Sequence, residues 1–431
     1  MLFFKRNTGW DGGKTLKKNR FWKVSASGAL IATLLFSTSL PLPQSFAPYA
    51  NVQVAHAEEQ QAAAALNIQS PVGLLMDAKS GQILWNKDMN AKRYPASVTK
   101  IMTMLLALEA VEKGEKKLTD VVPISNTAYG TEGSSVWLDP KEKWTLADMI
   151  EFIAIPSAND ACVATAEFIG GSEEGFVARM NAKAKELGMN DTHFADSNGL
   201  HHPDHYTTAH DIALMARELV TKYPQILETT KIQSKMIRDG KFKLENTNHL
   251  LGQYAGMDGL KTGFTDEAGY CLVATAERDG MRMISVELGA PNDSVRVSDS
   301  RTILDYGFNN YKQETLVKKG DSPEELATII SGKEERVPTV AAQDLSVAVK
   351  KDGAKLEKKV VYKEVTAPVK KDDVLGQMQV VQDGKVIASV DLLAKEDVEK
   401  GSWIRLMFRG IGDFFGGLFS AVGSVITGFF N

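Results

Sequence analysis

The stretch RYPASVTKIMTMLLALE, residues 93–109, places a serine three positions before a lysine at the start of a long apolar run. This pattern predicts a helix from Ser97 to about Glu112 that is buried on most sides. Residues three apart on a helix share a face, so we expect the Ser97 hydroxyl and the Lys100 amine within hydrogen-bonding reach. A buried lysine whose pKa is lowered can take the proton of a serine and make it a nucleophile. The stretch therefore predicts a rigid support for a nucleophile and its base.

Strands are predicted on both sides of this helix along the chain. Residues 72–88, VGLLMDAKSGQILWNKD, alternate in polarity and turn near Gly81, which predicts a β-hairpin. Residues 271–288 predict a second hairpin around Asp279-Gly280. With helices between the two hairpins, we expect an α+β domain whose sheet joins its N- and C-terminal parts.

A second candidate group is Ser157-Ala158-Asn159. Capping-box patterns at 145–148 and 208–211 predict helix starts, and Pro156 ends the first of these helices, which leaves Ser157 in a loop. A second hydroxyl can relay protons to a leaving group, and the Asn159 amide can hold a lysine and a substrate carbonyl. The alternative is that Ser157 or Asn159 merely caps the next helix, which we expect to end at Gly170-Gly171.

A third candidate group is Lys261-Thr262-Gly263 at the start of a β-rich segment. On an edge strand, a lysine and neighbouring hydroxyls offer a cation and donors to an anionic substrate end. Gly263 removes a side chain where backbone must pass close to a ligand. The alternative interpretation is a solvent-facing turn.

Ser-x-x-Lys, Ser-x-Asn and Lys-Thr-Gly in this order are far more specific together than any one of them alone. On these motifs the sequence resembles the serine penicillin-recognising enzymes, and within them the low-molecular-weight D-alanyl-D-alanine carboxypeptidases. The resemblance runs from LLMDAKSGQILWNKD through NTNHLLGQYAGMDGLKTGFT to TAPVKKDDVLGQMQVVQDGKVIASVDLLAKEDVEKGSW. It implies a serine β-lactamase/DD-peptidase-like transpeptidase fold, followed by a small all-β domain and a C-terminal amphipathic helix.

The resemblance also implies an acylation mechanism. Ser97 would attack the carbonyl between two D-alanines at the end of a peptidoglycan stem peptide, with Lys100 as proton acceptor. The backbone N–H groups of Ser97 and Phe264 would hold the oxyanion. Ser157 would pass a proton to the departing D-alanine, and Asn159 would orient Lys100 and the substrate.

The remaining implied roles concern the substrate's end. Lys261, Thr262 and Thr265, beside Gly263, would bind the terminal carboxylate, and water would then hydrolyse the acyl-enzyme. A β-lactam antibiotic such as penicillin would mimic the substrate but deacylate slowly. No cofactor is implied.

Two other functions stay open at this point, a β-lactamase and a catalytically silent wall-binding protein of the same fold. ELGMN, Glu186 to Asn190, loosely matches the loop whose glutamate activates the deacylating water in class A β-lactamases. The helix before it stops at Gly188, so we expect Glu186 to be a solvated last-turn residue. The second motif also has Ala158 where those β-lactamases usually carry aspartate.

The cysteines and histidines predict no metal site. Cys162 and Cys271 lie in apolar stretches, which favours buried free thiols. Four histidines gather in a Pro-containing loop that leads to a helix cap, and we expect them to be solvated or locally hydrogen-bonded rather than metal ligands: His201, His202, His205 and His210.

The rest of the chain suggests export and a membrane surface. A basic stretch, an apolar run and an A-x-A succession predict that residues 1–57 are a signal peptide, followed by a linker at 58–66. Residues 67–311 form the expected catalytic domain and 312–400 the all-β domain. In 401–431 aromatic and aliphatic residues fall on one half of a helical wheel, which predicts an amphipathic helix lying in a membrane surface. The net charge of −4 gives no reason to expect nucleic-acid binding.

Overall fold

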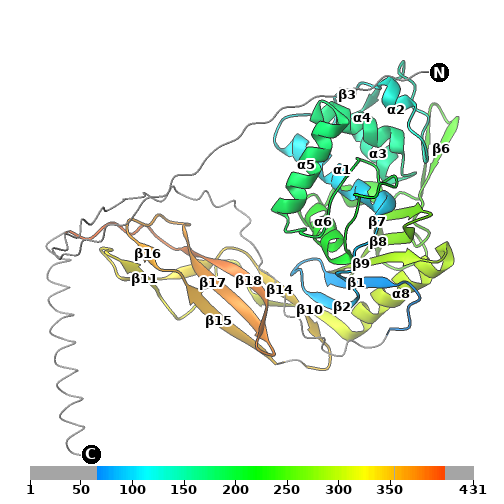
Figure 1. Cartoon of the computed structure of the whole chain (residues 1–431). Helices are drawn as coiled ribbons and strands as arrows, with labels where there is room; N and C mark the ends of the chain where they lie inside the picture. The colour runs from blue at the N-terminus through cyan, green and yellow to red at the C-terminus, as the bar shows by residue number, and fades with distance from the viewer. Residues whose placement is uncertain (1–65, 354, 403–431) are drawn as a thin grey trace, which may run out of the picture. The chain divides into compact units, whose positions relative to one another are not determined.

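The computed structural model describes residues 66–353 and 355–402 (Figure 1). The predicted signal peptide at 1–57 and all but the end of the predicted linker at 58–66 lie outside the described residues. The predicted amphipathic helix at 401–431 also lies outside them, apart from its first two residues. Among the helices of the described part, none is long and apolar enough to cross a membrane.

One five-stranded antiparallel sheet organises the N-terminal domain, with the order β2-β1-β9-β8-β7. Its strands are β1 (Val72–Asp77), β2 (Ile83–Lys87), β7 (Met257–Thr265), β8 (Gly269–Arg278) and β9 (Met281–Ala290). Both predicted hairpins are confirmed, as β1–β2 and β8–β9. β1 pairs with β9 along its whole length, so the sheet joins the two ends of the domain as expected. β7, which carries Lys-Thr-Gly, is an edge strand.

Helices cover both faces of this sheet (Figure 1). Leu74 and Met76 of β1 face a core shared with the helices on one side, whereas Leu75 faces Ile303 and Leu304 of α8 on the other. This alternation is the period of two expected for a strand buried on both faces. The helices are η1 (Ala96–Thr99), α1 (Lys100–Glu112), α2 (Asn126–Tyr129), α3 (Leu146–Ala154), α4 (Asn159–Gly170), α5 (Glu173–Glu186), α6 (Ala209–Lys222), α7 (Ile226–Thr230) and α8 (Asp293–Asn310).

The capping predictions are confirmed for one helix and half confirmed for another. Thr145 caps α3 in a reciprocal box with Asp148. The Thr208 side chain accepts a hydrogen bond from the Asp211 N–H at the start of α6, but the Asp211 carboxylate makes no return bond to the Thr208 N–H. It accepts instead from the Asp191 N–H and the Thr192 hydroxyl, which ties the preceding loop to the helix start.

Two-stranded sheets lie at the edge of the helical region, and a separate set of strands follows it. They pair β3 (Val121–Val122) with β4 (Trp144–Thr145) and β5 (Ser234–Ile237) with β6 (Phe242–Glu245). The later strands are β10 (Tyr311–Val317), β11 (Ala327–Ile330), β12 (Arg336–Val337), β13 (Thr339–Ala341), β14 (Leu345–Lys350), β15 (Leu356–Tyr362), β16 (Val365–Thr366), β17 (Val374–Gln382) and β18 (Lys385–Ala394). They have apolar cores of their own, and the described residues after 311 contain no helix, in agreement with the predicted all-β segment.

Candidate active site

Ser97 and Lys100 lie where the chain changes from one kind of helix to another. The predicted helix does not start at Ser97, because Ala96–Thr99 form a single 3-10 turn and α1 begins at Lys100. Side chains three apart are nearly eclipsed in a 3-10 helix, so this turn brings the two groups closer than an α-helix would. Lys100 Nζ lies 2.8 Å from Ser97 Oγ. The predicted contact is confirmed.

The Lys100 amine is fully buried and its hydrogen-bond partners are uncharged. Besides the Ser97 hydroxyl, it donates to Asn159 Oδ1 at 2.7 Å and to the Asn198 carbonyl at 2.6 Å. Burial lowers the pKa of Lys100 from 10.5, and the more distant Cys162 and Asp196 only partly oppose this shift. The Asn159 and Asn198 oxygens can accept both N–H groups of a deprotonated amine, whose lone pair would then lie on the side of the Ser97 hydroxyl.

The second motif contributes its asparagine to Lys100 directly. Asn159 opens α4, and its Nδ2 donates to the Glu132 carbonyl at 2.7 Å while its oxygen faces Lys100. The N-cap of α4 is Ala158, with no side-chain capping bond, so the alternative that Ser157 or Asn159 caps the helix is wrong. Ser157 is buried and has a left-handed backbone with φ of 66°. Such a conformation costs energy for a non-glycine residue and is typical of functional loops.

The third motif lies on β7, beside the first. Lys261 is 1% exposed, which rules out the solvent-facing turn. Its Nζ donates to the Thr262 carbonyl at 2.9 Å, and the Thr262 hydroxyl lies 2.5 Å from that of Thr247. Burial lowers the pKa of Lys261 well below 10.5, and positive charge on the neighbouring Lys100 or Arg296 lowers it further. An anion arriving at this lysine would remove much of that penalty.

Gly263 is where β7 meets the serine turn. A Cβ on Gly263 would lie 3.0 Å from Ser97 N and 3.1 Å from the carbonyl oxygen of Pro95, closer than side chains normally approach. The motif glycine therefore permits the contact between the two segments. Phe264 follows with a half-exposed ring that packs at a tilt against Tyr270, with the ring centroids 4.4 Å apart.

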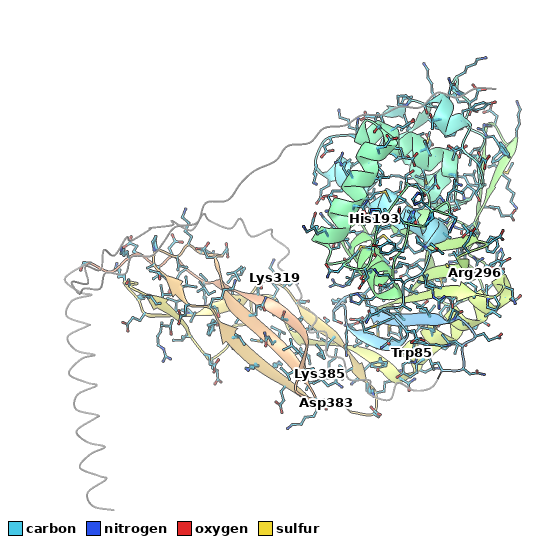
Figure 2. All side chains as sticks on the ribbon, viewed as in Figure 1. Trp85, His193, Arg296, Lys319, Asp383 and Lys385 are labelled. Carbon is cyan, nitrogen blue, oxygen red and sulfur yellow. The ribbon has the colours of Figure 1, made fainter. Side chains whose placement is uncertain are left out.

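Thr265 and Arg296 make hydrogen bonds that hold β7, the strand of the Lys-Thr-Gly motif, in place. The Thr265 hydroxyl accepts from the Ala268 N–H at 3.1 Å and so ties the turn into β8. Arg296 of α8, labelled in Figure 2, extends to the sheet, where its Nη1 lies 3.5 Å from the Gly263 carbonyl and 3.4 Å from that of Cys271. The guanidinium thereby fixes the back of the strand.

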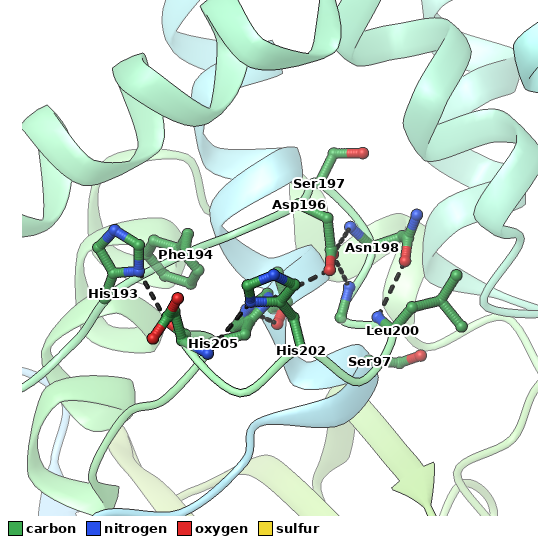
Figure 3. Close-up of polar contacts among 12 residues, drawn as sticks. Ser97, His193, Phe194, Asp196, Ser197, Asn198, Leu200, His202 and His205 are labelled. Atoms are coloured by element: carbon green, nitrogen blue, oxygen red, sulfur yellow. Dashed lines mark hydrogen bonds and ion pairs between the residues drawn. The ribbon is translucent and has the colours of Figure 1, made fainter. Parts of the chain in front are cut away.

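Sequence reasoning missed the loop that supplies the third acceptor of Lys100. Asp196 Oδ1 accepts the N–H groups of Asn198, at 2.9 Å, and of Gly199, at 2.5 Å, which shapes a tight turn and aims the Asn198 carbonyl at the amine. Figure 3 shows this turn beside Ser97, with His205 against Asp196. His205 also lies 3.0 Å from the Thr99 hydroxyl. The Asp-Ser-Asn-Gly sequence indicates a turn, but a backbone acceptor leaves no signal of its own.

The other predicted residues lie away from the amine or are bonded locally. Glu186 ends α5 with a side chain that is 65% exposed and paired with Lys183, as expected for a last-turn residue. Cys162 and Cys271 are buried free thiols, which confirms that prediction, and burial raises the pKa of Cys162 to about 12. His210 lies 3.1 Å from Asp211. Within the described ranges no three potential ligands gather as a metal site.

Comparisons with known proteins find close relatives along both parts of the chain. A family model described as D-alanyl-D-alanine carboxypeptidase matches residues 58–292, and one described as penicillin-binding protein 5, C-terminal domain, matches residues 311–400. The D-alanyl-D-alanine carboxypeptidase DacF of Bacillus subtilis is 38% identical over 390 residues, which cover 89% of this chain and 98% of the relative. DacC of Escherichia coli is 34% identical over 80% of this chain and 88% of its own length.

Solved structures resemble the chain as well. Penicillin-binding protein 5 of Haemophilus influenzae matches with a TM-score of 0.69 and 32% identity over 77% of this chain and 98% of its own. Penicillin-binding protein D2 of Listeria monocytogenes, solved in its ampicillin-bound form, matches with a TM-score of 0.52 and 34% identity over 56% of this chain and 99% of its own.

Proposed function

The chain belongs to the D-alanyl-D-alanine carboxypeptidase family, and from this premise we propose how its own residues carry out the reaction. The predicted family and the predicted DD-peptidase-like fold are confirmed. The protein is a serine-type D-Ala-D-Ala carboxypeptidase, a hydrolase of the cell wall.

Lys100 takes the proton of Ser97 in the acylation step. The Ser97 oxygen attacks the carbonyl carbon between the last two D-alanines of a peptidoglycan stem pentapeptide, and the peptide bond breaks as the serine ester forms. The observation that carries this assignment is the 2.8 Å contact between Ser97 Oγ and a fully buried amine surrounded by neutral acceptors. A base of lowered pKa adjacent to a serine is what general-base activation requires.

Two backbone N–H groups and a second hydroxyl assist this step. The N–H groups of Ser97 and Phe264 stabilise the oxyanion, and each such donor is worth about 3 kcal/mol in comparable sites. The close approach of Gly263 to Ser97 supports this pairing, since it brings the two backbone segments together. Ser157 delivers the proton to the departing D-alanine amine, while Asn159 holds both Lys100 and the substrate.

Lys261, Thr262 and Thr265 bind the terminal carboxylate of the substrate. The support is the burial of the Lys261 cation on an edge strand next to the serine turn, where a carboxylate would offset the cost of desolvation. Water then hydrolyses the ester and frees the shortened peptide. A β-lactam reacts with Ser97 in the same way, but its ester is hydrolysed slowly.

Export and membrane attachment follow from the terminal segments of the sequence. The chain is exported through residues 1–57 and held at the outer face of the cytoplasmic membrane by the apolar half of the helix predicted from the sequence at 401–431. Residues 67–311 form the catalytic domain, and the β-rich segment at 312–400 separates it from the anchor.

Replacement of the nucleophile tests the assignment. Ser97→Ala is expected to lower D-alanine release from a pentapeptide by on the order of 10⁴-fold or more, because loss of a catalytic serine removes the covalent route. The control is Ser298→Ala, which removes an exposed hydroxyl on α8 and leaves activity unchanged. Full activity of the Ser97 variant would contradict the mechanism, and a folded wild-type protein that releases no D-alanine would favour a silent wall-binding protein.

A further inference from the structure

Trp137 combines two costly features that the carboxypeptidase reaction does not use. Its side chain is 71% exposed, the largest value for a big apolar residue among the residues that the structure describes. Its backbone is left-handed, with φ of 57°, a conformation that bulky residues rarely adopt. A fold without a further purpose gains nothing by holding an indole in water on a strained backbone.

The backbone on either side of Trp137 is firmly held by Asp160. This carboxylate is fully buried and accepts the N–H groups of Val136, at 3.3 Å, and Leu138, at 3.0 Å, together with the Ser135 hydroxyl at 2.6 Å. Val136 and Leu138 are themselves fully buried. The neighbours of Trp137 are thus anchored inward.

Arg238 holds the same segment from the other side. Its guanidinium donates to the carbonyls of Val136, at 2.8 Å, and Trp137, at 3.1 Å, and it is fixed in turn by Glu142 at 2.6 Å. These contacts occupy the polar backbone groups around Trp137 and leave only the indole to face solvent. An aromatic side chain presented from a rigid backbone loses little conformational entropy when a ligand covers it.

This segment is hydrogen-bonded to Asn159 of the candidate active site. Asp160 follows Asn159 directly, and the Asn159 N–H donates to the Ser134 carbonyl at 2.7 Å, while its side chain holds the Glu132 carbonyl. Three residues span at most about 10 Å of chain, so Trp137 stands within that reach of a residue bonded to the asparagine of the active site. A substrate bound at Ser97 that extends toward this loop therefore passes the Trp137 indole.

We propose that Trp137 is the platform of a glycan subsite, where its indole face stacks on a sugar ring of the polymer that carries the stem peptide. The inference rests on the proposed function, which makes that polymer the substrate. A tryptophan side chain buries roughly 150–250 Å² of surface when a ligand covers it, far more than an alanine methyl group can. The flat C–H face of a pyranose ring has the right shape to pack on the indole.

The test compares one pentapeptide in two forms, free and linked to its disaccharide. Trp137→Ala is expected to raise KM for the glycan-linked form by about 5- to 20-fold, which corresponds to the loss of one good stacking contact. The KM for the free pentapeptide is expected to stay within about twofold of the wild-type value. Trp137→Tyr keeps an aromatic face and is expected to restore most of the preference. Val361→Ala, which shortens an exposed apolar side chain on β15, should leave KM unchanged for both substrates.

A second variant separates loss of the ring from loss of the fold. Trp137→Gly accommodates the positive φ without strain, so its unfolding temperature is expected to equal or exceed that of the wild type while the glycan preference disappears. An equal rise in KM for both substrates would overturn the proposal in favour of a contact with the stem peptide. An unchanged KM for both substrates would overturn it outright. If the wild type released no D-alanine from either form, the proposed function itself would fail.

Discussion

At the residue scale, the site depends on an amine that is buried but not paired with a carboxylate. Ser97, Lys100, Asn159 and Lys261 were all predictable, because each belongs to a short motif whose chemistry requires that residue type at that spacing. The Asn198 carbonyl was not predictable, since any residue supplies a backbone acceptor and only the turn around it decides where it points. The role that we propose for Lys100 as a base rests on both kinds of contact together.

The pH dependence of catalysis should report the two buried lysines. Lys100 acts as a base only when neutral, and Lys261 attracts a carboxylate only when charged, while burial lowers the pKa of both below 10.5. We therefore expect kcat/KM to pass through a maximum with pH, because one lysine must be deprotonated while the other is protonated. The two limbs belong to the coupled pair rather than to either residue alone.

A bound substrate should shift one limb only. Its carboxylate stabilises the protonated form of Lys261, so the pH range over which Lys261 loses its proton is expected to be higher for kcat than for kcat/KM. Lys261→Arg, whose charge does not titrate in this range, should leave a single limb that reports Lys100. A kcat/KM that is independent of pH would contradict the roles given to both lysines.

At the element scale, the contact between β7 and the 3-10 turn of η1 decides the geometry of the site. The hairpins, the edge position of β7 and the α3 capping box were predictable from alternation and cap residues. The 3-10 turn was not, because its four residues carry the same apolar pattern as the α-helix that follows. Only half of the capping box predicted at Thr208 forms, because the Asp211 carboxylate accepts from the N–H of the loop residue Asp191 instead.

Gly263→Ala tests this contact directly. The added methyl group would approach Ser97 N to 3.0 Å and would push β7 away from the turn. Displacement by a few tenths of an ångström is expected to lower the rate of acylation by about 10²-fold and to cost about 1–3 kcal/mol of unfolding free energy. Stopped-flow acylation by a chromogenic β-lactam and urea unfolding measure the two effects, and a wild-type rate would show that the close approach is not required.

At the scale of the whole molecule, the sheet brings motifs separated by more than 150 residues into one site. The pairing of β1 with β9 closes the domain, and α8 on the opposite face leads into the β-rich segment. The strands after residue 311 agree with the all-β segment expected from the sequence. Sequence patterns alone did not indicate which loops would touch Lys100, because such contacts depend on how whole elements pack.

Removal of residues 401–431 tests the anchor. The truncated chain is expected to stay in solution when the full chain sediments with lipid vesicles, because the apolar half of the predicted helix is gone. Its turnover of a soluble pentapeptide should stay within about twofold of the full chain, since every residue that we assign to the reaction lies at or before Thr265. Continued sedimentation of the truncated chain would place the membrane contact elsewhere.

The most direct measurement is the intact mass of the protein after reaction with penicillin, followed by mapping of the modified peptide. We predict the addition of one penicillin per chain, on the peptide that contains Ser97, lasting for minutes and absent from Ser97→Ala. An unchanged mass in a folded protein, or an adduct on any other residue, would contradict the claim that the buried Lys100 amine makes Ser97 the nucleophile.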